Sequence, residues 1–367
     1  MALQCGIVGL PNVGKSTLFN ALTQAGALAA NYPFATKDPN VGMITVPDKR
    51  LDQLAEIINP QKVVPTMVEI VDIAGLIKGA SKGEGLGNQF LANIREVNAI
   101  VHVVRCFEDT NVVHVDGNVD PVRDKEIIDL ELAFKDLEIL EKRAERLKKL
   151  AKTNDREIIR QLSIVEGLIA HLEEEKPARS YEEMETEDDI RFFKELQLLT
   201  AKPVIYVCNV DEASVNTGNE HTARFIESVK EERAQIIFVS AAIEAEIAEL
   251  DSEEEQMEFL SEMGLDEPGV NKVIRACYAI LELITYFTAG EKEVRAWTIK
   301  IGTKAPGAAG VIHTDFERGF IKARTVSYAD FVKHRGWKGA QEVGVMRQEG
   351  KEYIVHDGDL MEFMFNV

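Results

Sequence analysis

The sequence predicts an α/β protein whose first domain is built on a doubly wound parallel sheet. Five short apolar runs alternate with helical patterns, and each has the length of a buried strand: residues 4–8, 66–72, 99–105, 203–209 and 235–240. Parallel strands need a long crossover, usually a helix, so this alternation indicates a parallel sheet. Two departures from the alternation, a pair of long helices and a β-rich C-terminal stretch, predict the rest of the architecture.

The long helices lie between the third and fourth strands. Apolar residues recur at helical spacing over 127–150 and again over 158–172, and the polar turn 152–155 separates the two runs. Two amphipathic helices joined by a short turn predict an antiparallel hairpin inserted in the sheet domain. A third helix over 188–199, capped by Thr186, is expected to return the chain to the sheet.

From about Leu283 the sequence changes to short β-rich pieces separated by Gly and Pro, at 294–301, 319–323 and 351–356. This texture predicts a small, separate α+β domain. Its charges are nearly balanced, which makes it the better candidate for contact with RNA. The expected domains are a sheet domain at 1–127 plus 201–280, a helical arm at 128–200 and a C-terminal domain at 281–367.

Composition excludes several classes of protein. With 45% hydrophobic and 28% charged residues, the chain is neither disordered, collagenous nor membrane-embedded. Its net charge of -20 argues against non-specific coating of nucleic acid, so no DNA partner is expected. None of the four cysteines forms a C-x-x-C pair and no run of 18 apolar residues occurs. We therefore expect a cytoplasmic protein with no membrane partner.

Residues 9–16, GLPNVGKS, match the complete P-loop pattern between a predicted strand and a predicted helix. In this motif, backbone N–H groups and the helix N-terminus surround the phosphates of a nucleotide. Lys15 supplies positive charge to the β- and γ-phosphates, and the Ser16 hydroxyl is placed to bind Mg²⁺. The expected phosphate-binding residues are Asn12, Val13, Gly14, Lys15, Ser16 and Thr17.

A second strand ends in Asp72-Ile-Ala-Gly75. Asp72 is expected to hold a water on Mg²⁺, and the Gly75 N–H to reach the γ-phosphate. Thr36 lies in the loop after the first helix, where its hydroxyl completes the Mg²⁺ shell; the alternative is an ordinary loop threonine. Leu76 stands where many GTPases place a glutamine that orients water. His114, in the loop after the third strand, is a candidate polar substitute, although a lone loop histidine is more often structural.

The fourth strand ends in Asn209-Val-Asp-Glu212, where GTPases of this layout normally carry Asn-Lys-x-Asp. In that motif the aspartate accepts hydrogen bonds from guanine. Val210 replaces the lysine and Glu212 replaces the aspartate. Adenine has no 2-amino group, so a displaced carboxylate favours adenine over guanine. The expected base-binding residues are Asn209, Val210, Glu212, Ser240, Ala241 and Ala242, the last three after the fifth strand.

These motifs resemble those of the Obg-like ATPases of the YchF family. The similarity includes residues 9–16, 31–40, 72–75, 78–90 and 209–212, and in the C-terminal domain 297–299 and 309–321. It implies a Ras-like P-loop domain, an inserted helical arm and a β-grasp TGS domain. It also implies ATP hydrolysis and association with ribosomes, through the large subunit or RNA. Resemblance to potassium-stimulated Obg-type proteins further suggests that Asn12 helps hold K⁺; the alternative is an asparagine that only stabilises the loop.

Two other functions remain open on the sequence: a true GTPase with the same architecture, and a ribosome- or RNA-binding module gated by nucleotide. A basic cluster at the expected arm tip is either a solvated helix face or an RNA contact. The cluster comprises Lys142, Arg143, Arg146, Lys148, Lys149 and Lys152.

Overall fold

A computed structural model describes residues 3–28, 40–73, 86–110, 112, 117–232, 234–250 and 252–366. Thr36, Gly75, Leu76 and His114 lie outside these described residues. Contacts divide the chain into two compact units. The first contains the P-loop region Met1–Gln24 and Glu69–Val273, and the second combines Met43–Val68 with Ile274–Val367.

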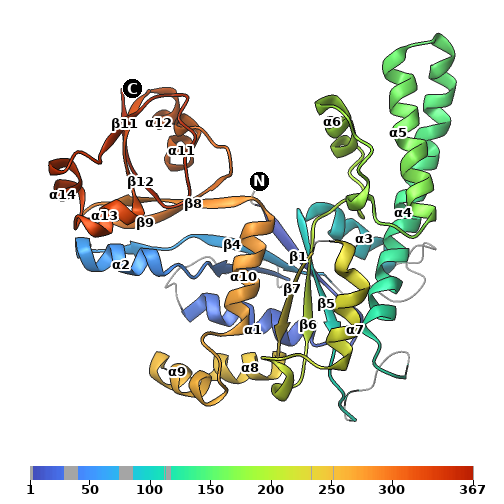
Figure 1. The fold of residues 1–367 in the computed structure, drawn as a ribbon, viewed down its shortest axis with the longest axis horizontal. Coiled ribbons are helices and arrows are strands. Elements are labelled where there is room, and N and C mark those ends of the chain that lie inside the picture. The colour runs from blue at the N-terminus through green and yellow to red at the C-terminus, as the bar shows by residue number, and fades with distance from the viewer. Residues whose placement is uncertain are drawn as a thin grey trace. The chain divides into compact units, whose positions relative to one another are not determined.

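The first sheet has six strands in the order β2-β4-β1-β5-β6-β7, and neighbours from β4 to β7 run parallel (Figure 1). Every residue of β5 and β6 is buried, as expected for central parallel strands covered on both faces. All five predicted strands are present. The strands are β1 Gln4–Val8, β2 Val41–Thr45, β4 Met67–Asp72, β5 Ala99–Arg105, β6 Val204–Asn209 and β7 Gln235–Val239.

The helices of this unit confirm the alternating pattern. They are α1 Lys15–Leu28, α3 Leu86–Glu96, α7 Glu220–Val229, α8 Ala241–Glu249, α9 Glu253–Glu262 and α10 Gly269–Ile280, the last of which crosses into the second unit. In the described part of the chain, no helix has both the length and the apolar character that crossing a membrane requires.

The inserted arm consists of α4 Pro121–Leu150 and α5 Arg156–Glu173, which pack side by side through one apolar core (Figure 1). Helix α4 begins six residues before the predicted pattern because Asp120 caps the N–H groups of Val122 and Arg123. Thr186 forms the predicted cap, in a capping box at the start of α6 Glu187–Glu195. Helix α6 ends earlier than predicted.

The second unit contains a six-stranded sheet in the order β11-β10-β12-β8-β9-β3. Strands β8 and β9 form an antiparallel hairpin and β12 runs parallel to β8, which is the arrangement of a β-grasp fold. The strands are β3 Val63–Val64, β8 Leu283–Ala289, β9 Val294–Lys300, β10 Phe320–Ser327, β11 Arg347–Glu349 and β12 Asp359–Phe365. Its helices are α2 Lys49–Ile58, α11 Ala305–Ile312, α12 Thr314–Arg318, α13 Tyr328–Lys333 and α14 Trp337–Glu342.

The predicted strand at 351–356 is wrong. Only Ile354 pairs there, in an isolated bridge to Lys304, and Tyr353 N–H closes a turn to Gly350. Val355 is buried in the core of the C-terminal fold while the backbone around it remains a loop.

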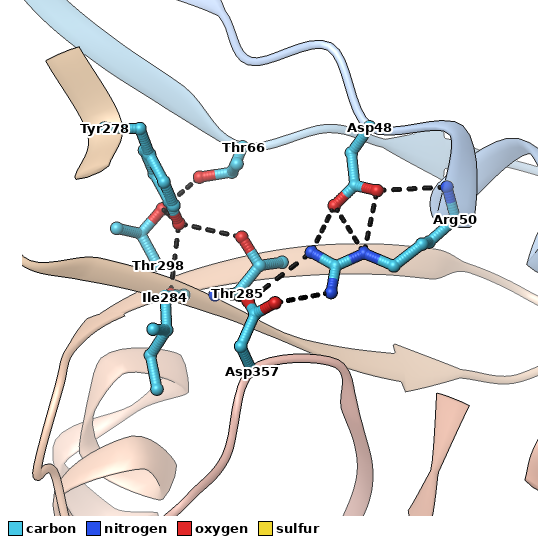
Figure 2. Close-up of polar contacts among 8 residues, drawn as sticks. All are labelled: Asp48, Arg50, Thr66, Tyr278, Ile284, Thr285, Thr298 and Asp357. Carbon is cyan, nitrogen blue, oxygen red and sulfur yellow. Dashed lines mark hydrogen bonds and ion pairs between the residues drawn. The ribbon is translucent and has the colours of Figure 1, made fainter. Parts of the chain in front are cut away.

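Residues 43–68, which the sequence placed in the first domain, pack within the second unit. Helix α2 buries Leu51 and Leu54 in a core shared with β8, β9, β10 and β12. Figure 2 shows the Arg50 guanidinium between Asp48 and Asp357, at 2.8 and 2.6 Å. The predicted three-domain division stays a prediction; contacts among the described residues give two units.

A second polar group in Figure 2 centres on the Tyr278 hydroxyl. It meets the Thr285 hydroxyl at 2.8 Å and the Thr298 hydroxyl at 3.2 Å, and donates to the Ile284 carbonyl. Thr298 in turn contacts Thr66, so hydroxyl groups link residues 43–68 to β8 and β9.

Candidate nucleotide-binding site

The loop between β1 and α1 requires glycine at two positions. Gly14 has φ +91°, and a Cβ there would overlap the side-chain amide of Asn209. A Cβ at Gly9 would lie 2.7 Å from the Val103 carbonyl oxygen. The backbone therefore takes a path that only this glycine spacing allows, with its N–H groups at the start of α1.

Asn209, in the base-reading segment at the end of β6, is connected by hydrogen bonds to the P-loop, which is distant in the sequence. Its buried side chain donates from Nδ2 to the Val13 carbonyl at 2.9 Å, and its Oδ1 accepts from the Ala241 N–H at 2.9 Å. The end of β6, the P-loop and the start of α8 are thus tied together by one amide. Both polar atoms of Asn209 are used in this way, so its place in the site is that of a bridge between loops.

Lys15 and Asp72 are brought together across 57 positions of sequence, where their side chains form an ion pair. Lys15 is 9% exposed at the start of α1, and Ser16 and Thr17 beside it are exposed. The Lys15 ammonium group lies against the Asp72 carboxylate. The Ser16 hydroxyl is a second oxygen ligand for a cation. Oxygen donors of this kind suit Mg²⁺, so these residues fit a magnesium site.

A cavity of about 1220 Å³ adjoins the P-loop. Pockets that hold small ligands commonly measure about 300–1,000 Å³, so this volume is ample for a nucleotide. The P-loop contributes Asn12, Gly14 and Thr17. All six residues predicted from the base-reading segments also line it: Asn209, Val210, Glu212, Ser240, Ala241 and Ala242.

The two carboxylates of the base-reading segment have different surroundings. Asp211 caps a short 3₁₀ turn, its Oδ1 accepting from the Ser214 N–H at 3.0 Å. Glu212 is exposed at the start of that turn, on the cavity wall. Val210 is buried and presents an apolar surface to the same cavity. Asp211 is also exposed and lines the cavity, but one of its carboxylate oxygens is occupied by the cap, so Glu212 has the carboxylate with both oxygens outside that turn.

A third wall was not identified from the sequence. Among the described residues after β5, those that line the cavity include Arg105, Phe107, Asp109, Val112 and Val119. The available signal was Arg105, a charged residue that ends an otherwise apolar predicted strand.

A strand–P-loop–helix junction, an Asp at the end of a neighbouring strand and a cavity bounded by the loops after β5, β6 and β7 define a P-loop nucleotide-binding protein of the Ras-like class. Two sequence families match. Residues 4–140 match one described as "50S ribosome-binding GTPase", and residues 283–366 match the YchF GTPase C-terminal family, described as a protein of unknown function.

Whole-chain relatives name the family. "Ribosome-binding ATPase YchF" of Bacillus subtilis is 57% identical over 369 residues, covering 100% of both chains. The protein of the same name from Escherichia coli O157:H7 is 55% identical over 368 residues, with the same coverage. The solved structure of the Schizosaccharomyces pombe YchF GTPase superposes with TM-score 0.89 and 40% identity, covering 99% of this chain and 97% of that one. The chain belongs to the YchF family, which confirms the predicted family and fold class.

Proposed function

We propose that this chain binds and hydrolyses ATP and that its nucleotide state controls its association with the ribosome. The observation that carries the proposal is the Asn209 bridge, which sets the P-loop and an Asn-Val-Asp-Glu segment on one cavity. Its bacterial relatives are named ribosome-binding ATPases. The fission yeast relative is described as a GTPase, so the choice of base is the open point.

The cavity wall supports adenine. Val210 offers an apolar surface for a base and no ammonium group, and Glu212 has one more methylene than the aspartate that guanine sites use. When the hydrogen-bond donors of a base find no acceptor in a buried site, the binding free energy of that base is less favourable by about 1–3 kcal/mol. The alternative is a GTPase in which Glu212 reaches the guanine despite its length.

Magnesium is the proposed cofactor, held by the Ser16 hydroxyl and through Asp72, with Thr36 completing the shell. When bound it neutralises charge on the β- and γ-phosphates. Lys15 then exchanges Asp72 for phosphate oxygens, and the Gly75 N–H faces the γ-phosphate. We also propose that Asn12, which lines the cavity, helps hold K⁺, and that K⁺ or His114 replaces the missing glutamine.

Ribosome association is proposed through the large subunit or RNA, in the cytoplasm, with no DNA or membrane partner. The arm tip supplies candidate contacts. Lys142 and Lys148 are exposed and pair with Glu138 and Glu166. Arg146, Lys149 and Lys152 are exposed too. Exposed cations grouped at a helix end suit a phosphate backbone. The alternative is a ribosome-binding module whose nucleotide only gates docking.

The test is ATP hydrolysis by Lys15→Ala and Ser16→Ala, with the exposed Lys338→Ala as control. Both P-loop variants are expected to lose measurable turnover and to remain folded, whereas the control retains wild-type turnover. Unaltered turnover in either P-loop variant would contradict the assignment. Co-sedimentation of Lys15→Ala with ribosomes then separates an enzyme from a nucleotide-gated docking module.

A further inference from the structure

Arg105 is a fully buried arginine at the C-terminal end of β5, only 1% exposed. The six residues before it in the strand are buried as well. A guanidinium removed from water is costly unless its N–H groups find acceptors. Whether Arg105 is stable in this buried position therefore depends on the acceptors that its N–H groups find.

The acceptors are three backbone carbonyls of one loop. Nε donates to Phe107 at 3.1 Å, Nη1 to Val112 at 3.0 Å and Nη2 to Asp109 at 3.3 Å. The guanidinium also lies over the Phe107 ring, 4.5 Å from its centroid. Arginine offers five donors in a fixed planar fork, so these contacts define the path of the loop in a way that a lysine cannot reproduce.

The start of this loop has its own anchors, because the Cys106 N–H donates to the Asn209 carbonyl and the Cys106 carbonyl accepts from Asn219. Farther along, Glu108 meets His221 at 3.2 Å, but Glu108 is largely exposed. The Arg105 fork is the buried element that reaches Phe107, Asp109 and Val112 together.

The same residues form a wall of the nucleotide cavity. Phe107, Asp109 and Val112 line it together with Val210 and the start of α8, the segments to which base binding is assigned. We propose that Arg105 is a positioning residue that preforms this wall and thereby sets affinity for the nucleoside part of the nucleotide. The phosphate part depends on the P-loop and α1, so Arg105 acts on binding of the nucleoside and leaves phosphate binding unchanged.

This inference rests on the proposed function, because it takes a nucleoside triphosphate as the ligand. The test uses the full-length chain and two probes, ATP–Mg²⁺ and inorganic tripolyphosphate–Mg²⁺, with affinity measured by calorimetry. Arg105→Met keeps an unbranched side chain of core-compatible apolar character but is shorter, and it removes every donor. Arg105→Lys keeps the charge and loses the fork. Arg179→Met is the control, an arginine whose side chain is 13% exposed and which pairs with Glu232 at the base of the arm.

Arg105→Met is expected to weaken ATP binding at least tenfold and to leave tripolyphosphate affinity within twofold of wild type. In steady-state hydrolysis KM rises in proportion while kcat changes less than threefold. Arg105→Lys is expected to show the same separation with a smaller loss, and it carries the test if the methionine variant does not fold. Arg179→Met leaves both affinities unchanged.

Unchanged ATP affinity in a folded Arg105 variant would overturn the proposal. So would parallel loss of ATP and tripolyphosphate, which indicates general damage to the domain. A wild-type protein that binds ATP no better than tripolyphosphate would instead contradict the proposed nucleotide function, so the two failures are distinguishable.

Discussion

Gly14 and Asn209 depend on each other, although 195 positions separate them in the sequence. The amide of Asn209 occupies the space that a Cβ at Gly14 would take, and it donates to the carbonyl of the neighbouring Val13. A P-loop glycine is usually explained by the approach of phosphate to the backbone. Here protein packing imposes the same requirement before any ligand is considered.

Gly14→Ala is therefore expected to displace Asn209 and to abolish measurable nucleotide binding by calorimetry. Gly302→Ala is the matched control, because Gly302 also has positive φ, +84°, but nothing lies within 4 Å of a Cβ there. The control is expected to cost about 1 kcal/mol in free energy of unfolding and to leave nucleotide binding intact. Equal nucleotide affinity in Gly14→Ala and wild type would show that Asn209 does not organise the site.

Glu232 is the acidic centre of a half-buried ion-pair network at the base of the arm. It pairs with Lys125 at 2.6 Å and Arg179 at 2.7 Å, and accepts from the Tyr206 hydroxyl at 2.7 Å. Burial by itself raises the pKa of this carboxyl, but the two cations outweigh it and lower the pKa to about 2. The folded state therefore holds Glu232 charged at pH values where the unfolded chain protonates it.

The folded pKa lies below the ordinary value of 4.5, so this stabilisation is complete above pH 4.5 and is lost as pH falls towards 2. Glu232→Gln is expected to lower the free energy of unfolding at pH 7 by about 3 kcal/mol, since it removes the carboxylate that pairs with Arg179 and leaves Lys125 with Asp129 alone. The difference in free energy of unfolding between wild type and Glu232→Gln should become smaller below pH 4.5. Glu138→Gln is the control: its pKa is also lowered to about 2, mainly by Lys135, but on an exposed surface, so a much smaller change is expected. A difference between wild type and Glu232→Gln that is constant from pH 7 to pH 3 would contradict this account.

At the scale of elements, α2 is the least expected feature. Its sequence has the helical spacing of Leu51, Leu54 and Ile58, and Asp48 caps it, so the helix itself was open to prediction. The residues against which α2 packs were not open to prediction. Its contacts with Phe287, Phe331 and Leu360 span hundreds of residues and leave no local pattern in the sequence. The prediction of a strand at 351–356 is wrong for the same reason: residues with high strand propensity occur there, whereas strand pairing depends on a distant partner.

Leu54→Ala tests the membership of α2 in the second unit. Leu54 is fully buried in its core, so the substitution is expected to cost about 2–5 kcal/mol in free energy of unfolding. Amide hydrogen exchange in β8 and β9 should accelerate. Leu150→Ala, at a 43% exposed arm position, should change neither. Unchanged exchange in β8 and β9 would indicate that the C-terminal fold does not need α2.

At the scale of the whole molecule, the sequence predicted the family, both sheets and the arm, because the phosphate and base motifs have fixed spacing and the strands alternate with helices. Of the predicted site residues within the described chain, the structure gathers those of the base-reading segments on one cavity and pairs Lys15 with Asp72. It adds the wall held by Arg105. The sequence offered one signal for that wall, Arg105 at the end of a predicted strand, but its partners were not predictable because they are backbone carbonyls, which any sequence supplies.

The arm tip makes the ribosome proposal testable. Replacing Arg146, Lys149 and Lys152 with Glu is expected to weaken co-sedimentation with ribosomes at least tenfold at low salt, since each exposed cation contributes to phosphate contact. Slow basal ATP hydrolysis without ribosomes should remain at the wild-type rate. Substitution of Lys333 and Lys338 with Glu in the C-terminal unit is the control. If only the control variant loses co-sedimentation, the contact lies in the C-terminal fold and not in the arm.

The cavity is proposed to take ATP, although the domain belongs to a class named for GTP. The most direct measurement is calorimetric titration of the wild-type protein with ATP and with GTP, in the same magnesium buffer. With Val210 and Glu212 at the base, we predict that ATP binds at least as tightly as GTP. Tenfold tighter binding of GTP would contradict the account.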